Sequence, residues 1–299
     1  ISRAQLAKEL EPGLNALFGL EYDRYEDEAA EIFESESSDR AFEEEVMLSG
    51  FGTAPVKSEG SAINFDNAQE TYTARYTMET IALAFSITEE AVEDNLYDSL
   101  AKRYTRALAR SMSQTKQIKG ATIMNNAFST TSPIGDGAAL CSAAHPSLSG
   151  NQTNLLATPA DLNETSLEEI LIQIAGFTDE RGLKIAVRGT KLLIPKELQF
   201  IAERIINSNL RPGSADNDIN AMKSMGMLPE GAVVNHFFTD ADAYFVKTDC
   251  PNGFKLFNRT PLKTAMEGDF DTGNMRFKAR ERYSFGVSDW RSVFGTPGA

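Results

Sequence analysis

The strongest periodic pattern in the chain is a stripe of apolar side chains that recurs every fourth residue. An S-x-x-E capping box at Ser86 and Glu89 predicts the start of a helix, and acidic residues crowd the turns that follow. The pattern runs over about 87–126, which predicts an amphipathic helix of about 60 Å at 1.5 Å per residue. Such a helix exceeds the diameter of an ordinary domain. The apolar stripe consists of Val92, Leu96, Leu100, Tyr104, Leu108 and Met112.

A polar segment precedes this helix. Residues 49–78 are rich in Gly, Ser, Asn and Thr and end in an alternating run over 71–78, which predicts a strand with almost no apolar face. We therefore predict a long hairpin that is polar on both faces. An isolated two-stranded hairpin is marginal in water, so this one needs a partner surface.

The middle of the chain predicts an α/β lobe. Thr165 and Glu168 form a second capping box, and an apolar helical face follows it. Residues 191–194 predict a buried strand that ends at Pro195, a residue suited to the first turn of the next helix. A loop of turn residues over 209–220 comes next. Short strands are expected at about 232–237, 243–247 and 254–257.

The last predicted element is a long strand with two different faces. Apolar residues from Met275 to Phe285 alternate with cations, and only Glu281 interrupts the apolar face. A basic face of this kind would meet acidic groups better than water. The cations are Arg276, Lys278, Arg280 and Arg282.

Charge changes how the N-terminal segment is interpreted. Between Glu21 and Glu45 there are twelve Asp or Glu and only two Arg, so residues 1–48 predict either a solvated tail or an arm laid across a neighbouring copy. The formal net charge of −14 disfavours a conventional duplex-binding protein, although a protein that merely encloses nucleic acid escapes this objection. Long apolar runs and a leader pattern are missing, so we expect no membrane span.

Residues with possible catalytic or metal chemistry are few. Two Cys–His pairs could make a zinc site, but about ninety residues separate them, so we expect no metal. Paired aspartates could serve a hydrolase, although turn-capping is the better interpretation. Nucleophile-elbow, P-loop and dinucleotide motifs are not found, so we predict a protein that is not an enzyme and has no cofactor. The residues considered are Cys141, His145, His236, Cys250, Asp216, Asp218, Asp240 and Asp242.

The order of these elements resembles a known family. Three phrases carry the likeness, together with the long helix: LLIPKELQFIAERI at 192–205, RPGSADNDIN at 211–220 and DTGNMRFKARERYSFGVSDWRSVFG at 271–295. The chain resembles the major capsid proteins of tailed bacteriophages with the Hong Kong 97-type α+β fold. In detail it is similar to the major head subunits of Mu-like phages.

The resemblance implies a division of the chain and a function. Subunits would assemble as pentamers and hexamers into an icosahedral virion shell in the host bacterial cytoplasm. The shell would enclose double-stranded genomic DNA without sequence-specific binding, and scaffold, portal and decoration proteins are possible partners. The implied parts are an N-terminal arm at 1–48, an extended loop at 49–80, a peripheral domain at 81–154 with a spine helix, an axial domain at 155–249, and return strands at 250–299 that complete both domains.

Physics supports the assembly prediction independently of the resemblance. A thin hairpin and a helix longer than its domain cannot bury themselves, so copies of the chain must cover them. Three alternatives stay open: an encapsulin-like nanocompartment, a tail or portal protein, and a soluble hydrolase that uses Asp216 and Asp218. The residues expected at subunit interfaces are Phe65, Tyr72, Arg75, Tyr76, Arg211, Asp216, Asp218, Arg276, Lys278, Arg280 and Arg282.

Overall fold

The chain forms two compact units, each assembled from three separate stretches. The computed structural model describes residues 3–88, 90, 97–211, 218–269 and 273–299. Unit 1 comprises Ile1–Glu43, Tyr76–Gly120 and Leu256–Phe285, and unit 2 comprises Glu44–Arg75, Ala121–Lys255 and Gly286–Ala299. Helices and strands occur in both units, which agrees with the predicted α+β class. Within the described ranges, no helix is both long and apolar enough to cross a membrane.

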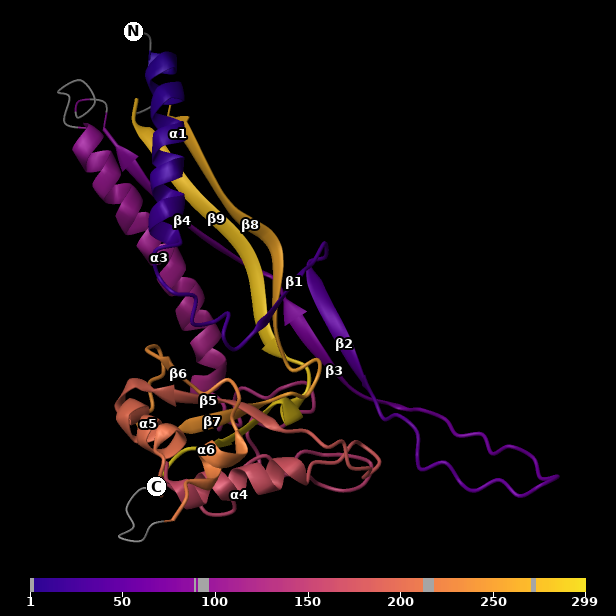
Figure 1. The fold of residues 1–299 in the computed structure, drawn as a ribbon. Coiled ribbons are helices and arrows are strands. Elements are labelled where there is room, and N and C mark those ends of the chain that lie inside the picture. The colour runs from indigo at the N-terminus through magenta and orange to yellow at the C-terminus, as the bar shows by residue number, and fades with distance from the viewer. Residues whose placement is uncertain (1–2, 89, 91–96, 212–217, 270–272) are drawn as a thin grey trace. The chain divides into compact units, whose positions relative to one another are not determined.

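Unit 1 is a four-stranded sheet with two helices packed on one face (Figure 1). The strand order is β1-β8-β9-β4. Leu14 and Phe18 of the first helix and Leu108 and Met112 of the long helix pack against Phe277 of the sheet. The elements are α1 (Arg3–Tyr22), β1 (Glu34–Ser37), β4 (Glu79–Ile87), α3 (Tyr97–Asn125), β8 (Phe254–Gly268) and β9 (Met275–Val287).

The predicted two-faced strand is confirmed in β9. Phe277, Ala279 and Tyr283 are buried, whereas Lys278 and Arg280 are exposed. The strand pairs antiparallel with β4, and the opposed Phe85 and Phe277 rings lie 5.5 Å apart between centroids. The period of two along β9 therefore sends the apolar residues to the helices and the cations to the other face.

The long helix ends as predicted but does not begin at residue 87. Residues 79–87 form strand β4 instead, because Ile81, Phe85 and Ile87 turn toward the core and the strand pairs with β9. Ser86 lies in this strand, and Glu89 of the proposed capping box is outside the described residues, as are Val92 and Leu96.

The buried stripe of α3 also differs from the predicted one. Leu108 and Met112 are buried as expected, but Tyr104 is half-exposed and touches Phe85 at 5.7 Å. Small side chains at Ala101 and Ala109 are fully buried in its place. The helix thus packs on the sheet through its alanines as well as its large residues.

The acidic N-terminal segment is more structured than a solvated tail. It contains α1, β1 and strand β2 (Phe42–Leu48), and the buried Leu14 and Phe18 place α1 in the core of unit 1. Strand β2 pairs with β3 (Glu70–Thr77). The predicted hairpin therefore has its second strand in the expected place, but its first strand precedes residue 49 and no strand or helix forms over 49–69.

Unit 2 contains the predicted α/β lobe. Its sheet has the order β10-β7-β5-β6, in which only the β5–β6 pair is parallel. Trp290, Phe294 and Tyr244 join the apolar faces of its helices in one core. The elements are α4 (Glu164–Ala175), β5 (Gly189–Pro195), α5 (Gln199–Asn207), α6 (Ala221–Met225), β6 (Ala232–Asn235), β7 (Tyr244–Thr248) and β10 (Val293–Thr296), with short 3-10 turns at Lys196–Leu198 and Trp290–Ser292.

The cap of α4 lies two residues before the predicted one. The Asn163 side chain accepts from the Ser166 amide at 2.8 Å, and the Ser166 hydroxyl accepts from the Asn163 amide at 3.1 Å. Asn163 and Ser166 are therefore the reciprocal pair, rather than Thr165 and Glu168. Pro195 ends β5 and directly precedes a 3-10 turn, close to its expected role.

One carboxyl group lies on the apolar face of β9. Glu281 is buried, its Oε2 accepts from the Tyr22 hydroxyl at 3.3 Å, and its Oε1 has no hydrogen-bond partner in the described structure. Burial raises the pKa of Glu281 above its ordinary value, and the cation of Lys116 only partly opposes this. The Glu281 carboxyl group therefore holds its proton more readily in the folded state than an exposed glutamate does.

We expect Glu281→Gln to stabilise the protein at neutral pH. A raised folded-state pKa gives stability that is present at low pH and is lost as pH rises through that pKa. The glutamine side chain does not ionise and so avoids this loss of stability. The melting temperature at pH 7 should therefore rise by roughly 2–4 °C, the effect of about 1 kcal/mol. Thermal unfolding at pH 7 and below about pH 4 checks this, because protonated wild-type Glu281 should remove the difference at low pH. An equal shift at both pH values would contradict the charge explanation.

Candidate functional site

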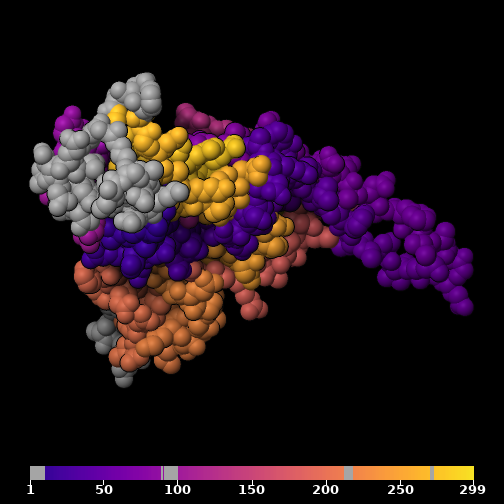
Figure 2. Space-filling model, turned by 90° about the horizontal axis from the view of Figure 1, so that it is seen from above, coloured from indigo at the N-terminus to yellow at the C-terminus, as the bar shows by residue number. Residues whose placement is uncertain are grey.

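Segment 49–69 of unit 2 is exposed over most of its length, apart from the buried Ser49 at its start. Residues 53–69 are all exposed, and the large apolar side chains Val56 and Phe65 are 98% and 96% exposed. Figure 2 shows the segment in purple as two thin limbs that separate around an opening. Apolar groups in such a segment contribute nothing to the core of their own chain, and exposed apolar groups of this kind mark interaction surfaces.

A polar clasp holds the base of this segment. The Asp66 carboxylate accepts from the Gly52 amide at 2.8 Å and from the Arg181 guanidinium at 2.7 Å. Arg181 also donates to the carbonyl oxygen of Asn67 at 2.6 Å. The Gly52 hydrogen bond, followed by Arg181, lowers the pKa of Asp66. The clasp therefore fixes where the two limbs extend from the rest of unit 2. The tip between the limbs is not covered by other described residues.

Tyr72 and Tyr76, which were expected at an interface near this segment, make contacts within their own chain. The Tyr72 hydroxyl donates to the Ser288 carbonyl oxygen at 3.2 Å. Tyr76 is buried and packs edge-on against Phe257 at 4.8 Å. Arg75 is exposed and lies 3.7 Å from Glu44. Of the residues expected here, Phe65 and Arg75 are exposed, Tyr72 is half-buried, and the Tyr76 ring is buried.

The cations of β9 form a second exposed feature, here named the basic face. Arg276, Lys278 and Arg280 are exposed, and Arg276 contacts Asp269 at 2.5 Å. Arg282 is half-buried, and its Nε has no hydrogen-bond partner within the described ranges. The structure thus brings together the four cations that the sequence placed on one side of the strand.

The aspartate loops show turn geometry where they are described. The Asp240 carboxylate accepts from the Asp242 amide at 3.1 Å, as expected of a capped turn. Arg211 donates from its Nε to Glu164 at 3.0 Å, and its amide donates to the Asp218 carbonyl oxygen. Asp216, the other half of the proposed carboxylate pair, lies outside the described residues.

His145 and Cys141 have structural contacts. The two ring nitrogens of His145 lie 2.6 Å from Asp136 and 2.9 Å from Asn154, and its ring stacks on Trp290 at 4.4 Å. Cys141 is buried, and burial raises the pKa of its thiol. The described ranges contain no group of three or more His, Cys, Asp or Glu arranged to hold a metal ion.

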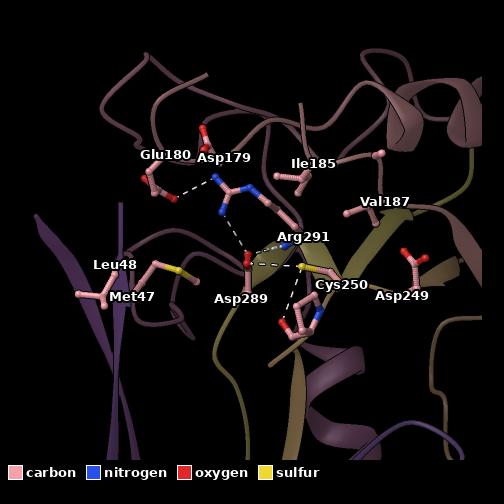
Figure 3. A pocket seen from close by; sticks show the side chains of 12 residues that line it. Met47, Leu48, Asp179, Glu180, Ile185, Val187, Asp249, Cys250, Asp289 and Arg291 are labelled. Carbon is pink, nitrogen blue, oxygen red and sulfur yellow. Dashed lines mark hydrogen bonds and ion pairs between the residues drawn. The ribbon is translucent and has the colours of Figure 1, made fainter. Parts of the chain in front are cut away.

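Unit 2 also contains a pocket of about 370 Å³ with acidic and apolar walls (Figure 3). Arg291 is one of the lining residues and lies 2.9 Å from Glu180 and 3.3 Å from Asp289, with its side chain 3% exposed. Its Nε donates to the Thr178 carbonyl oxygen at 2.7 Å. Met47, Leu48, Ile185 and Val187 supply the apolar wall, and Asp179, Asp249 and Cys250 complete the polar one.

This pocket holds a buried ion cluster rather than a reactive group. The carboxylates of Glu180 and Asp289 surround Arg291 and satisfy its charge. Burial and the nearby Asp289 raise the pKa of the Cys250 thiol, which keeps the thiol neutral and a poor nucleophile. The sequence did not predict the cluster, because Glu180 and Arg291 lie 111 positions apart and share no motif.

Comparison with known proteins decides the family. Residues 71–295 match the sequence model of a family described as phage capsid protein, which covers well over half of the chain. The chain belongs to the phage capsid protein family. No curated protein sequence matches this capsid protein.

Solved structures share the fold of the capsid protein at low sequence identity. A virus-like particle from Pyrococcus furiosus matches with a TM-score of 0.54 and 8% identity, over 95% of this chain and 97% of the other. The capsid of an empty GTA particle gives 0.56 and 13% over 92% and 91%. The capsid of Myoviridae phage XM1 gives 0.53 and 11% over 90% and 89%.

These findings confirm the predicted Hong Kong 97-type fold and the role of a major capsid protein of the virion shell. The narrower resemblance to Mu-like head subunits stays a prediction.

Proposed function

We propose that this capsid protein assembles as pentamers and hexamers into an icosahedral shell around double-stranded DNA. The observation that carries the proposal is the segment 49–69, whose apolar side chains find no cover in their own chain. Burial between copies is the physical way to remove this surface from water. A subunit of such a shell needs no catalytic group, and we propose none.

The parts of the chain suit different roles in this shell. We assign segment 49–69 with its β2–β3 stem to the extended loop that lies over a neighbour. Helix α3 with the sheet of unit 1 would be the spine and peripheral domain, and the lobe at 155–249 the axial domain around the symmetry axes. The interface residues that remain proposed are Phe65, Tyr72, Arg75, Arg211, Asp216, Asp218, Arg276, Lys278, Arg280 and Arg282, whereas Tyr76 is buried within its own chain.

Negative-stain imaging of the purified protein tests the proposal. We expect hollow polyhedral particles. In the proposed function these shells assemble in the bacterial cytoplasm and contain no membrane. Particles from the natural source should contain nuclease-protected double-stranded DNA, whereas a protein cargo would favour an encapsulin-like compartment. A single ring or tube would favour a tail or portal protein. A monomer with a hydrolase activity that Asp216→Asn abolishes would overturn the shell function altogether.

A further inference from the structure

The face of the unit 1 sheet opposite the helices is exposed along most of β4 and the first half of β9, and becomes half-buried at Arg282. Leu262 and Met266 of β8 pack with Phe277 toward the helices. Because side chains alternate along a strand, Lys263 lies on the opposite face, as do Lys278 and Arg280 of β9. All three are exposed. The basic face therefore extends over two adjacent strands.

Several of these cations have no anionic partner. Arg276 contacts Asp269, and Arg259 contacts Asp39. Within the described part of the chain, Lys263, Lys278 and Arg280 form no ion pair. In a protein of net charge −14, three adjacent unpaired cations are a strong local exception. Such a face suits an anionic partner.

The neighbouring strand leaves these cations accessible. On β4, Ala82 stands opposite Arg280 and Ala84 stands opposite Lys278. Both alanines are exposed, and a methyl group cannot shield a long charged side chain. A partner strand could therefore lie flat on this face of β4 and β9 and contact the guanidinium and ammonium groups directly.

Strand β1 carries charges of the opposite sign at the same spacing. Glu34 and Glu36 alternate with Ser35 and Ser37, and the whole strand is exposed at the edge of the sheet. Residues two apart on a strand lie about 6.8 Å from each other, which holds for Glu34 and Glu36 as it does for Lys278 and Arg280. Glu36 also has a contact within its own chain, but the exposure of the strand leaves both carboxylates within reach of a second copy.

We propose that the basic face of one copy docks the acidic strand β1 of a second copy. This inference rests on the proposed shell function and names the partner surface of one contact. The two surfaces consist of different residues, so the contact is heterologous, and repeated heterologous contacts form a ring when the rotation between copies closes. Pentamers and hexamers are rings of this kind.

Charge reversal tests this contact. Lys278→Glu/Arg280→Glu should lower the yield of shells about tenfold at equal protein concentration, because like charges then oppose each other. Glu34→Lys/Glu36→Lys should do the same. A chain with all four substitutions restores opposite charges and should recover shells. Circular dichroism confirms that each variant folds, and Lys278→Gln/Arg280→Gln gives a variant without repulsion, expected to lose yield more mildly.

The matched control carries the same charge change elsewhere in unit 1. Arg103→Glu/Arg106→Glu alters two exposed cations of α3 and should leave the yield unchanged. Normal shells from either β-strand reversal, failure of the fourfold variant to recover, or an equal loss in the α3 control would each overturn the inference. Normal shells that contain less DNA would overturn it in favour of a nucleic-acid contact. Wild-type protein without shells would instead refute the proposed function.

Discussion

A chain in which residues 53–65 are replaced by a short glycine–serine turn should fold normally and form no closed shells. The replaced residues are exposed throughout and belong to neither hydrophobic core. Gly52, Asp66 and Arg181 are retained, so the clasp at the base of the segment can still form. We expect the free energy of unfolding to change by less than about 0.5 kcal/mol, as for other surface changes. Electron microscopy should show the loss of particles.

The control for this deletion keeps its length. A variant in which only the exposed Val56, Ile63 and Phe65 become serine separates the apolar contact from the reach of the segment. If apolar burial between copies drives assembly, this variant should also lose most shells. Closed particles of normal size from the shortened chain would show that segment 49–69 does not cover a neighbour.

The second large effect is expected at the buried ion cluster of unit 2. Arg291→Met should destabilise the protein by about 3–5 kcal/mol, because Glu180 then keeps a buried and unpaired charge. Denaturant unfolding measures this loss. Arg188→Met is the matched control, since Arg188 is exposed, and should change stability by less than about 0.5 kcal/mol.

A double variant separates the charge from the packing. In Arg291→Met/Glu180→Leu the cluster loses one buried charge of each sign, so much of the lost stability should return. Asp289 retains its hydrogen bond from the residue 291 amide and a contact with Cys250, which limits the remaining cost. A double variant as unstable as Arg291→Met would show that side-chain packing, rather than the unpaired carboxylate, governs the effect.

The sequence predicted those elements whose two faces differ strongly. Strand β9 alternates large apolar residues with cations, and β5 is a short apolar run that ends at a proline, so both were located correctly. Strand β4 was missed because the small residues on its exposed face weaken the alternation, and the S-x-x-E box at Ser86 indicated the start of a helix there. Pairing with β9 makes it a strand, and pairing is a tertiary property.

The residues of the candidate site were likewise predicted only where a local pattern determines their position. The four cations of β9 were predicted because strand geometry alone puts them on one face. The burial of Tyr76 was not, since it depends on Phe257, 181 positions further along the chain. The clasp of Asp66 and Arg181 and the cluster of Glu180 and Arg291 also join distant residues. Local patterns contain no information on such contacts.

The interleaving of the two units has a consequence for biosynthesis. Strand β4 of unit 1 finds its partner β9 only after nearly two hundred further residues have been translated, and β10 of unit 2 comes later still. Neither sheet can be completed on a nascent chain that stops before residue 275. Contacts so distant in sequence slow folding. Both sheets therefore close only after residues 275–296 have been translated, and until then their unpaired strand edges are open to association with other chains.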